Sequence, residues 1–217
     1  MKRRFRATIQ TRVLILALSG LVLCAFAFGK LCLHTTDKVV HESTEKHLHN
    51  LTSIETIKIN NRLKNVEQYV NTLNIAVMGM LDSLEQLTDS THLEEFTEKS
   101  RELIRLTIGN TDKAVAAYLR FNPKFTPPTS GIFMAKTSRD HELKFLEPTD
   151  FSKYNPDDIE HVGWYYVPIR TKQPTWMMPY LNKNIGIYMI SYVIPLFKFN
   201  TEIGVIGVEA ARTNPRY

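Results

Sequence analysis

The sequence has little cysteine, and what it has is confined to one short segment. Both cysteines, Cys24 and Cys32, lie within residues 13–33, so the rest of the chain has no disulfide framework and no cysteine metal site. The sequence also lacks a Gly-x-Ser-x-Gly motif, a His-Glu-x-x-His motif and a glycine-rich phosphate loop. Without an activated nucleophile or a paired acid and base, we expect no enzyme, no catalytic residues and no cofactor.

Metal binding has one weak candidate. His41, Glu45 and His49 recur every four residues, so on a helix they would share one face and could bridge a zinc ion. The alternative is solvated charge on an exposed helix, which needs no bound ion. We therefore expect no metal.

Beyond the N-terminus, the sequence has no excess of either sign of charge. The chain has 27 basic and 22 acidic residues. Five of the basic residues precede Val13, and without them the two signs balance. The positive net charge therefore belongs to the N-terminal tail, and we expect no nucleic-acid partner.

One long hydrophobic run is present. Val13–Gly29 carries no charge and Leu31–Leu33 extends the run past Lys30, which gives roughly the 20 apolar residues that span a membrane. Basic residues before a first span stay in the cytoplasm. We expect residues 1–12 to form a basic cytoplasmic tail and residues 13–33 to cross the plasma membrane once, with the C-terminal part extracytoplasmic.

A cleaved signal peptide is the alternative to this anchor, because Ala25-Phe26-Ala27 resembles a cleavage site. Apolar residues continue beyond that site, however, and a long helical pattern follows closely. We therefore expect the segment to be retained as a signal anchor.

A hydrophobic seam follows the apolar run. Its residues alternate spacings of four and three, the heptad pattern of a helix that packs along one stripe. They are Ile59, Leu63, Val66, Val70, Leu73, Val77, Met80, Leu84 and Leu87. We expect residues 34–90 to form a long stalk helix that self-associates as a homodimer along part of the seam. The alternative is a helix that packs only on its own domain.

Residues 91–217 have the pattern of a mixed domain. We expect a helix from Thr91 to about Ile108 and a second one that starts at Asn155–Asp158 and ends near Pro168. The expected strands are Ala114–Phe121, Gly131–Lys136, Leu143–Leu146, Ile187–Phe199 and Ile203–Ala211. The fold class is therefore α+β: a transmembrane helix that continues into a stalk helix, followed by an antiparallel sheet with inserted helices.

Aromatic residues concentrate between residues 164 and 192. Prolines at 168, 174 and 179 keep part of this segment out of regular structure. Aromatic walls with a few polar groups suit a small-molecule pocket, and their ring faces favour a cationic amine. An aromatic sheet core is the alternative. The residues concerned are Trp164, Tyr165, Tyr166, Trp176, Tyr180, Tyr188 and Tyr192, interleaved with Asn182 and Asn184.

Five segments carry a family resemblance through their order and spacing. They are Tyr118–Pro123, Gly163–Tyr165, Trp176–Tyr180, Ile190–Pro195 and Ile203–Glu209. Together they resemble the double Cache sensor domain of bacterial chemoreceptors, sensor kinases and diguanylate cyclases. The resemblance implies a PAS-like sheet on a long helix, with ligand bound in the membrane-distal subdomain. It also implies that this chain stops after that subdomain. A short gene, a frameshift or a cut could each give such a chain.

The pocket pattern of the amino-acid-binding members implies the site residues. Its tryptophan and tyrosine match Trp164 and Tyr180, and its two ammonium-binding aspartates fall on Asn182 and Glu209. Its carboxylate-binding arginine falls on Val162, so we favour an amine or an uncharged metabolite over an α-amino acid. Arg120 could supply the missing charge from another direction. The expected ligand-binding residues are Trp164, Tyr165, Trp176, Tyr180, Asn182, Tyr192, Glu209 and Arg120.

The combined pattern predicts an extracytoplasmic small-molecule-sensing domain of a membrane-anchored bacterial signal-transduction protein whose output domain is absent from this chain. The alternative is a membrane-tethered structural or interaction protein that works through its coiled-coil stalk.

Overall fold

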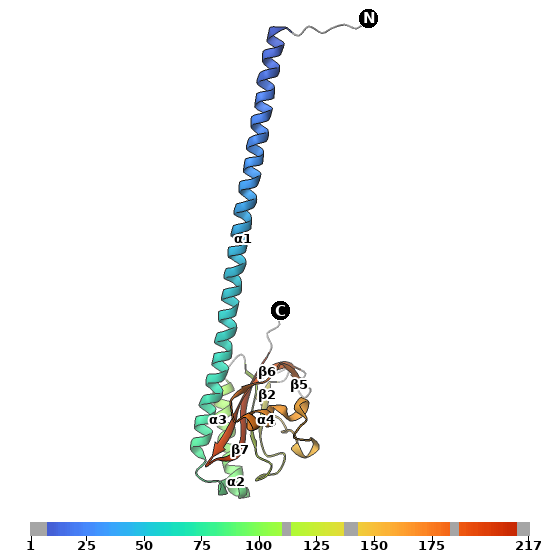
Figure 1. The fold of residues 1–217 in the computed structure, drawn as a ribbon. Helices are drawn as coiled ribbons and strands as arrows, with labels where there is room; N and C mark the ends of the chain where they lie inside the picture. The colour runs from blue at the N-terminus through green and yellow to red at the C-terminus, as the bar shows by residue number, and fades with distance from the viewer. Residues whose placement is uncertain (1–7, 110–113, 137–142, 183–186, 212–217) are drawn as a thin grey trace. The chain divides into compact units, whose positions relative to one another are not determined.

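The computed structural model of the 217-residue chain describes residues 8–109, 114–136, 143–182 and 187–211. The chain divides into two compact units, Met1–Asn60 and Asn61–Tyr217. One helix, α1 (Ile9–Met80), contributes to both (Figure 1).

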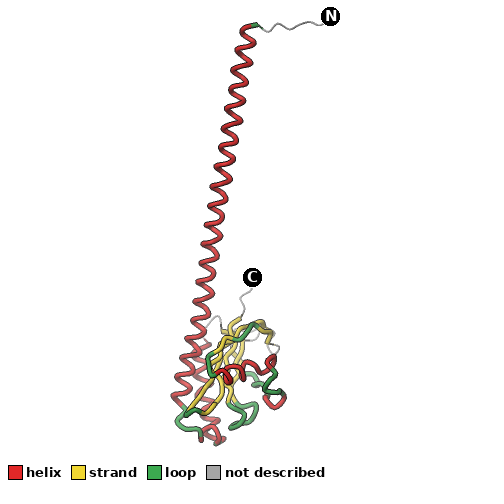
Figure 2. The backbone as a smooth tube through the Cα atoms, viewed as in Figure 1, coloured by secondary structure: helices red, strands yellow, loops and turns green. Residues whose placement is uncertain are grey.

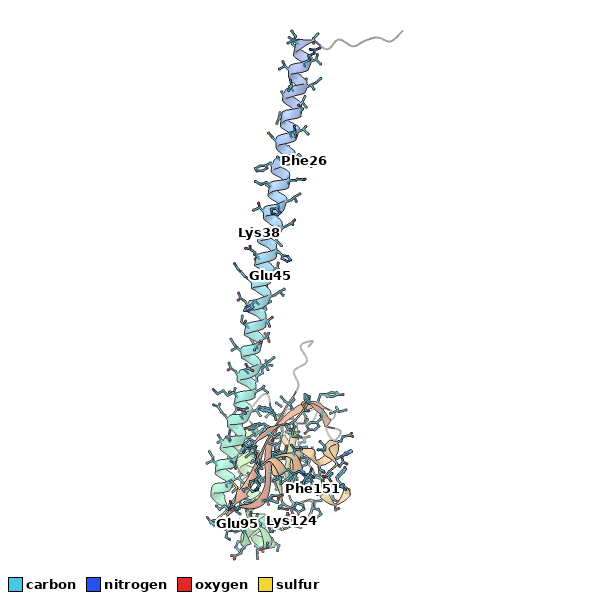
Figure 3. All side chains as sticks on the ribbon, viewed as in Figure 1. Phe26, Lys38, Glu45, Glu95, Lys124 and Phe151 are labelled. Carbon is cyan, nitrogen blue, oxygen red and sulfur yellow. The ribbon has the colours of Figure 1, made fainter. Side chains whose placement is uncertain are left out.

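The first unit consists, in its described part, of the N-terminal portion of α1. This portion holds the one helical stretch among the described residues that is long and apolar enough to cross a membrane. Its side chains are exposed, and Figure 3 shows Phe26, Lys38 and Glu45 pointing outward from the helix. The expected candidate span is therefore present. His41 and Glu45 lie 3.9 Å apart, but no metal-binding group of His, Cys, Asp or Glu occurs within the described ranges.

The second unit begins with residues 61–80 of α1, where four residues of the predicted seam are buried. Val66, Val70, Leu73 and Val77 pack into the core of their own unit. This part of the helix therefore packs on its own domain, as the alternative interpretation proposed.

Helix α1 ends at Met80, earlier than the seam predicted. Leu84 and Leu87 lie beyond this end, and Leu87 belongs to the four-residue helix α2 (Glu85–Thr88). Two side chains make hydrogen bonds to the backbone between α1 and α2. The side chain of Gln86 accepts from the backbone N–H of Asp82 at 2.8 Å, and the Nζ of Lys198 donates to the carbonyl of Leu81 at 2.5 Å. The prediction of one helix over residues 34–90 is wrong, because α1 ends at Met80 and these groups satisfy the break that follows.

The remaining elements form an antiparallel sheet with helices. In chain order they are α3 (Ser90–Gly109), β1 (Ala114–Phe121), β2 (Gly131–Lys136), β3 (Leu143–Phe145), the 3-10 helix η1 (Phe151–Lys153), α4 (Ile159–Thr171), β4 (Thr175–Trp176), β5 (Tyr180–Asn182), β6 (Ile187–Lys198) and β7 (Thr201–Ala211). The strand order is β3-β2-β1-β7-β6-β4, and β5 also pairs with β6. The α+β class and the five expected strands are confirmed. Figure 2 shows the strands and helices of this unit by colour.

Helix α4 starts three residues later than its start signal predicted. The side chain of Asn155 accepts from the backbone N–H of Asp157 at 2.9 Å, so Asn155 closes a turn. Asp158 is the N-cap and accepts from the backbone N–H of His161 at 3.2 Å. Pro168 lies within the helix, which continues to Thr171 and ends before Lys172 in the left-handed conformation.

Each face of the sheet has its own hydrophobic core. Residues from α1, α3 and alternate positions of the central strands form one core, which includes Leu73, Ile104 and Leu119. Residues from η1, α4 and the other alternate positions form the second core, which includes Phe151 and Tyr165. Side chains alternate between faces along a strand. The central strands therefore contribute to both cores, and each face presents a different set of residues.

Candidate functional site

A small cavity lies on the α4 face of the sheet. Its volume is about 40 Å³, and it is lined by Tyr118, Arg120, Phe133, Thr149, Trp164, Tyr180 and Glu209. Such a volume holds roughly one to three water molecules. Small-molecule sites usually enclose about 300–1,000 Å³. A metabolite can enter only if the walls of this cavity move.

Trp164 of α4 forms one aromatic wall of the cavity. The indole nitrogen of Trp164 donates to the carbonyl of His161 at 2.9 Å, so its polar group is satisfied within the helix. The ring of Tyr118 meets Trp164 edge-on, with centroids 5.0 Å apart. Phe151 of η1, labelled in Figure 3, lies 5.8 Å from Trp164. Trp164 is thus held in one orientation and contributes ring surface to the cavity.

A tyrosine and a buried glutamate meet on the opposite wall. The hydroxyl of Tyr180 donates to Oε1 of Glu209 at 2.5 Å and lies 3.1 Å from the hydroxyl of Ser191. Glu209 is only 3% exposed. Burial, reinforced by Glu209, raises the pKa of Tyr180, which keeps its hydroxyl protonated as a donor. This hydrogen bond joins β5 to β7 in the lining of the cavity.

Arg120 brings a positive charge to the cavity, but most of its donors are already in use. Its Nε donates to the carbonyl of Ser130 at 3.1 Å, and its Nη2 donates to those of Pro128 and Thr149 at 2.9 and 2.7 Å. Burial lowers the pKa of Arg120 to about 10. A two-pronged grip on a carboxylate needs two adjacent nitrogens. Arg120 can offer such a ligand one free nitrogen, Nη1, at most.

Four of the eight predicted site residues lie together. Trp164, Tyr180, Glu209 and Arg120 all line the cavity. Tyr165 is buried in the adjoining core, where its hydroxyl donates to Oε1 of Glu202 at 3.1 Å. The side chain of Asn182 lies outside the described residues, although its backbone pairs with Ile187.

Trp176 and Tyr192 lie on the other face of the sheet. Their rings pack 5.0 Å apart against the α1 core. The indole nitrogen of Trp176 donates to Oε1 of Glu67 in α1 at 2.8 Å. Alternation along β6 explains the separation, because Tyr192 follows Ser191, whose side chain faces the cavity side.

Three lining residues were not predicted from the sequence. They are Tyr118, Phe133 and Thr149, which lie outside the aromatic segment 164–192. Side-chain alternation along β1 could have indicated Tyr118, because it lies two residues before Arg120 and therefore on the same face of the sheet. Strand pairing was also needed, because Tyr118 stands opposite Gly207 in the register of β7. Val162, where the family's arginine would fall, is fully buried in the core and is not a lining residue.

The comparisons with known proteins agree with this architecture. Residues 100–213 match the family described as methyl-accepting chemotaxis protein-like, first PDC sensor domain. The sensory domain of the Campylobacter jejuni chemoreceptor Tlp3 with isoleucine bound has a TM-score of 0.53 and 17% identity, covering 79% of this chain and 60% of that one. The Tlp3 ligand-binding domain in complex with L-valine gives the same TM-score, identity and coverage of this chain, with 61% of its own length.

This chain therefore spans about 60% of the length of those Tlp3 structures. At 17% identity the likeness establishes the fold alone. No curated protein sequence matches the chain significantly. The family match covers more than half of the chain and confirms the resemblance to Cache sensor domains. The chain belongs to the family of methyl-accepting chemotaxis protein-like first PDC sensor domains.

Proposed function

We propose that this domain senses a small molecule outside the cytoplasm as part of a membrane-anchored bacterial signalling protein. The observation that carries the proposal is the meeting of aromatic walls, a buried carboxylate and a buried arginine in one cavity. A few fixed polar groups among aromatic walls are typical of a small-molecule pocket. This combination supports a binding role for the cavity.

The recognised group, in this proposal, is an ammonium held by Glu209 and the aromatic walls. Ring faces and a buried carboxylate both attract a cation. The preference for an amine over an α-amino acid finds no support among the relatives, because Tlp3 is solved with isoleucine and with L-valine. Amines and amino acids share the ammonium, so we propose that group as the common feature. A ligand carboxylate could accept one hydrogen bond from Nη1 of Arg120, for which no partner occurs among the described residues.

Binding would act through the segment that connects Tyr180 to Trp176. An ammonium at Glu209 competes with the hydroxyl of Tyr180, so ligand entry would displace β5. Four residues earlier in the chain, Trp176 contacts Glu67 of α1. A displaced segment would thereby change how the sheet packs on α1. The shift would be only as large as the difference in ligand affinity between the two packings.

The proposed arrangement keeps the expected division of the chain except at the stalk, which ends with α1 at Met80. Residues 1–12 would be cytoplasmic, residues 13–33 would span the membrane and residues 34–80 would carry the stalk. Residues 91–217 would form the ligand-binding domain, together with the packed part of α1. Self-association would use the exposed apolar residues Leu48, Leu51 and Ile54.

A thermal shift of the full chain in lipid nanodiscs tests the ligand proposal. Both tryptophans, Trp164 and Trp176, lie in the second unit, so intrinsic fluorescence follows that unit directly. The compounds are the twenty proteinogenic amino acids, their decarboxylated amines and their deaminated acids. We expect one or more amines or amino acids to raise the melting temperature by mass action, and the matched acids to have no effect.

Glu209→Gln is the matched variant, because it keeps the shape of the side chain and removes its charge. It should abolish the shift caused by ammonium compounds. The proposal fails if no compound shifts the melt, or if deaminated acids act as well as amino acids.

A membrane-tethered structural protein is the second candidate. The small volume of the cavity, about 40 Å³, favours it, since a vestigial pocket would also be closed. The same melts separate the two functions: a structural protein would respond to no compound, and Glu209→Gln would then change only its stability.

A further inference from the structure

Tyr118 has its ring fixed between a glycine and a tryptophan. A Cβ atom added at Gly207 would lie 2.5 Å from Cζ of Tyr118 and 2.6 Å from its hydroxyl oxygen, so the ring lies directly over the backbone of β7. Trp164 meets the ring edge-on at a centroid distance of 5.0 Å. Tyr118 is 3% exposed. These contacts hold its hydroxyl in one place on the cavity wall.

The hydroxyl of Tyr118 has no hydrogen-bond partner among the residues that the structure describes. Its polar neighbours are engaged with each other, because Tyr180 donates to Glu209 and lies 3.1 Å from Ser191. Ser191 lies close enough to Tyr118 to offset part of the effect of burial on the pKa of Tyr118. Burial raises the pKa of Tyr118 well above its usual range, so the hydroxyl keeps its proton.

We propose that Tyr118 is a specificity-determining residue of the cavity, whose hydroxyl donates to an oxygen of the bound ligand. This inference rests on the proposed function and extends it from the ammonium to a second group on the same ligand. A site with a buried donor rejects molecules that cannot accept its hydrogen bond. Tyr118 therefore selects amines that also carry a nearby carboxylate, amide or hydroxyl oxygen over plain amines.

A water molecule is the competing partner for this hydroxyl. The cavity of about 40 Å³ has room for one. A water that stays in the liganded state would satisfy Tyr118 without conferring any selectivity. The two explanations differ in what removal of the hydroxyl does to ligand affinity.

Isothermal titration calorimetry on the full chain in nanodiscs distinguishes them. Wild type and Tyr118→Phe are titrated with the twenty proteinogenic amino acids and with the decarboxylated amine of each. We expect wild type to bind its best amino acid about tenfold more tightly than the matched amine, the value of one good hydrogen bond. In Tyr118→Phe this discrimination should fall to what Nη1 of Arg120 alone supplies, while affinity for the plain amine stays unchanged.

Melting temperatures supply a second measurement that needs no ligand. Tyr118→Phe deletes a hydroxyl without a partner, so its melting temperature should be at least that of wild type. Tyr165→Phe is the matched control, because the deleted hydroxyl donates to Glu202 and Tyr165 does not line the cavity. The control should melt at a lower temperature and bind with unchanged affinity.

Three results would overturn the inference. A melting temperature of Tyr118→Phe as low as that of Tyr165→Phe would show that the hydroxyl has a partner inside the protein. Undiminished discrimination in Tyr118→Phe would assign the hydroxyl to water. If wild type bound none of the compounds, the proposed function would fail and this inference with it, whereas the first two results leave the proposed function standing.

Discussion

The indole nitrogen of Trp176 donates a hydrogen bond to Oε1 of Glu67 at 2.8 Å, joining two residues that are 109 positions apart. Trp176 belongs to β4, in the segment that leads to Tyr180 and the cavity. Glu67 belongs to α1, the helix that also contains the candidate membrane span. This hydrogen bond is a polar contact between the sheet and that helix.

Removal of this contact should weaken the packing of the sheet on α1. Trp176→Phe keeps an aromatic ring but loses the donor, so the free energy of unfolding should fall by about 1 kcal/mol or more. Urea unfolding followed by the fluorescence of Trp164 measures the change. Glu67→Ala alone and combined with Trp176→Phe completes a double-mutant cycle. Strictly additive effects in the cycle would argue against a direct interaction.

Alanine substitution should change the free energy of unfolding in opposite directions at two glycines. Gly204 has a φ of +154°, and its added Cβ would lie 1.9 Å from the carbonyl oxygen of Arg120. Gly204→Ala should therefore cost about 3 kcal/mol or more. Gly79 lies in α1 with nothing within 4 Å of an added Cβ, so Gly79→Ala should stabilise by about 0.5–1 kcal/mol. Equal effects in urea unfolding would contradict the placement of β7 against β1.

Three buried tyrosines predict a loss of stability at alkaline pH. Burial raises the pKa of Tyr118, Tyr165 and Tyr180 above the ordinary value of 10.0. The unfolded chain loses these protons near pH 10 while the folded chain keeps them. The stabilisation is therefore complete below pH 10 and is lost as the pH rises above it.

The free energy of unfolding should fall by about 1.4 kcal/mol per pH unit for each such tyrosine. Urea unfolding at several pH values above 10 measures the slope, and Tyr165→Phe should reduce it by about 1.4 kcal/mol per pH unit. A slope that Tyr165→Phe leaves unchanged would mean that Tyr165 titrates equally in both states.

Self-association should depend on the exposed part of α1. Leu51→Asp changes an exposed residue, so it should weaken any dimer and leave the melting temperature unchanged. Val77→Asp places a charge in the core and should instead unfold the second unit. Sedimentation of the purified chain measures the first effect and tryptophan fluorescence the second. A dimer that survives Leu51→Asp would exclude this stripe as the interface.

The strands were predictable from sequence because their patterns are long and strong. The β6–β7 hairpin combines two β-favouring runs with a turn at Phe199 and Asn200, which both adopt positive φ. The short strands β4 and β5 were not predicted, because two or three residues carry too little pattern. The end of α1 at Met80 was missed as well, since it depends on Lys198, a residue 117 positions beyond the carbonyl of Leu81.

The site was half predictable for a related reason. Trp164 and Tyr180 stand out by type, whereas Trp176 and Tyr192 look the same in the sequence and point to the other face. Only strand register assigns an aromatic residue to a face, and a one-residue shift reverses the assignment. Tyr118 lacked a distinguishing neighbour in sequence, because its partner Gly207 comes from a distant strand.

Fluorescence titration of the Trp176→Phe chain tests the central claim most directly. Trp164 is then the only tryptophan, and it lines the cavity. The titrants are the amino acids and amines that raise the melting temperature. The account predicts a saturable change in Trp164 emission that Glu209→Gln abolishes. Calorimetrically saturated protein with unchanged Trp164 emission, or an undiminished response in Glu209→Gln, would contradict it.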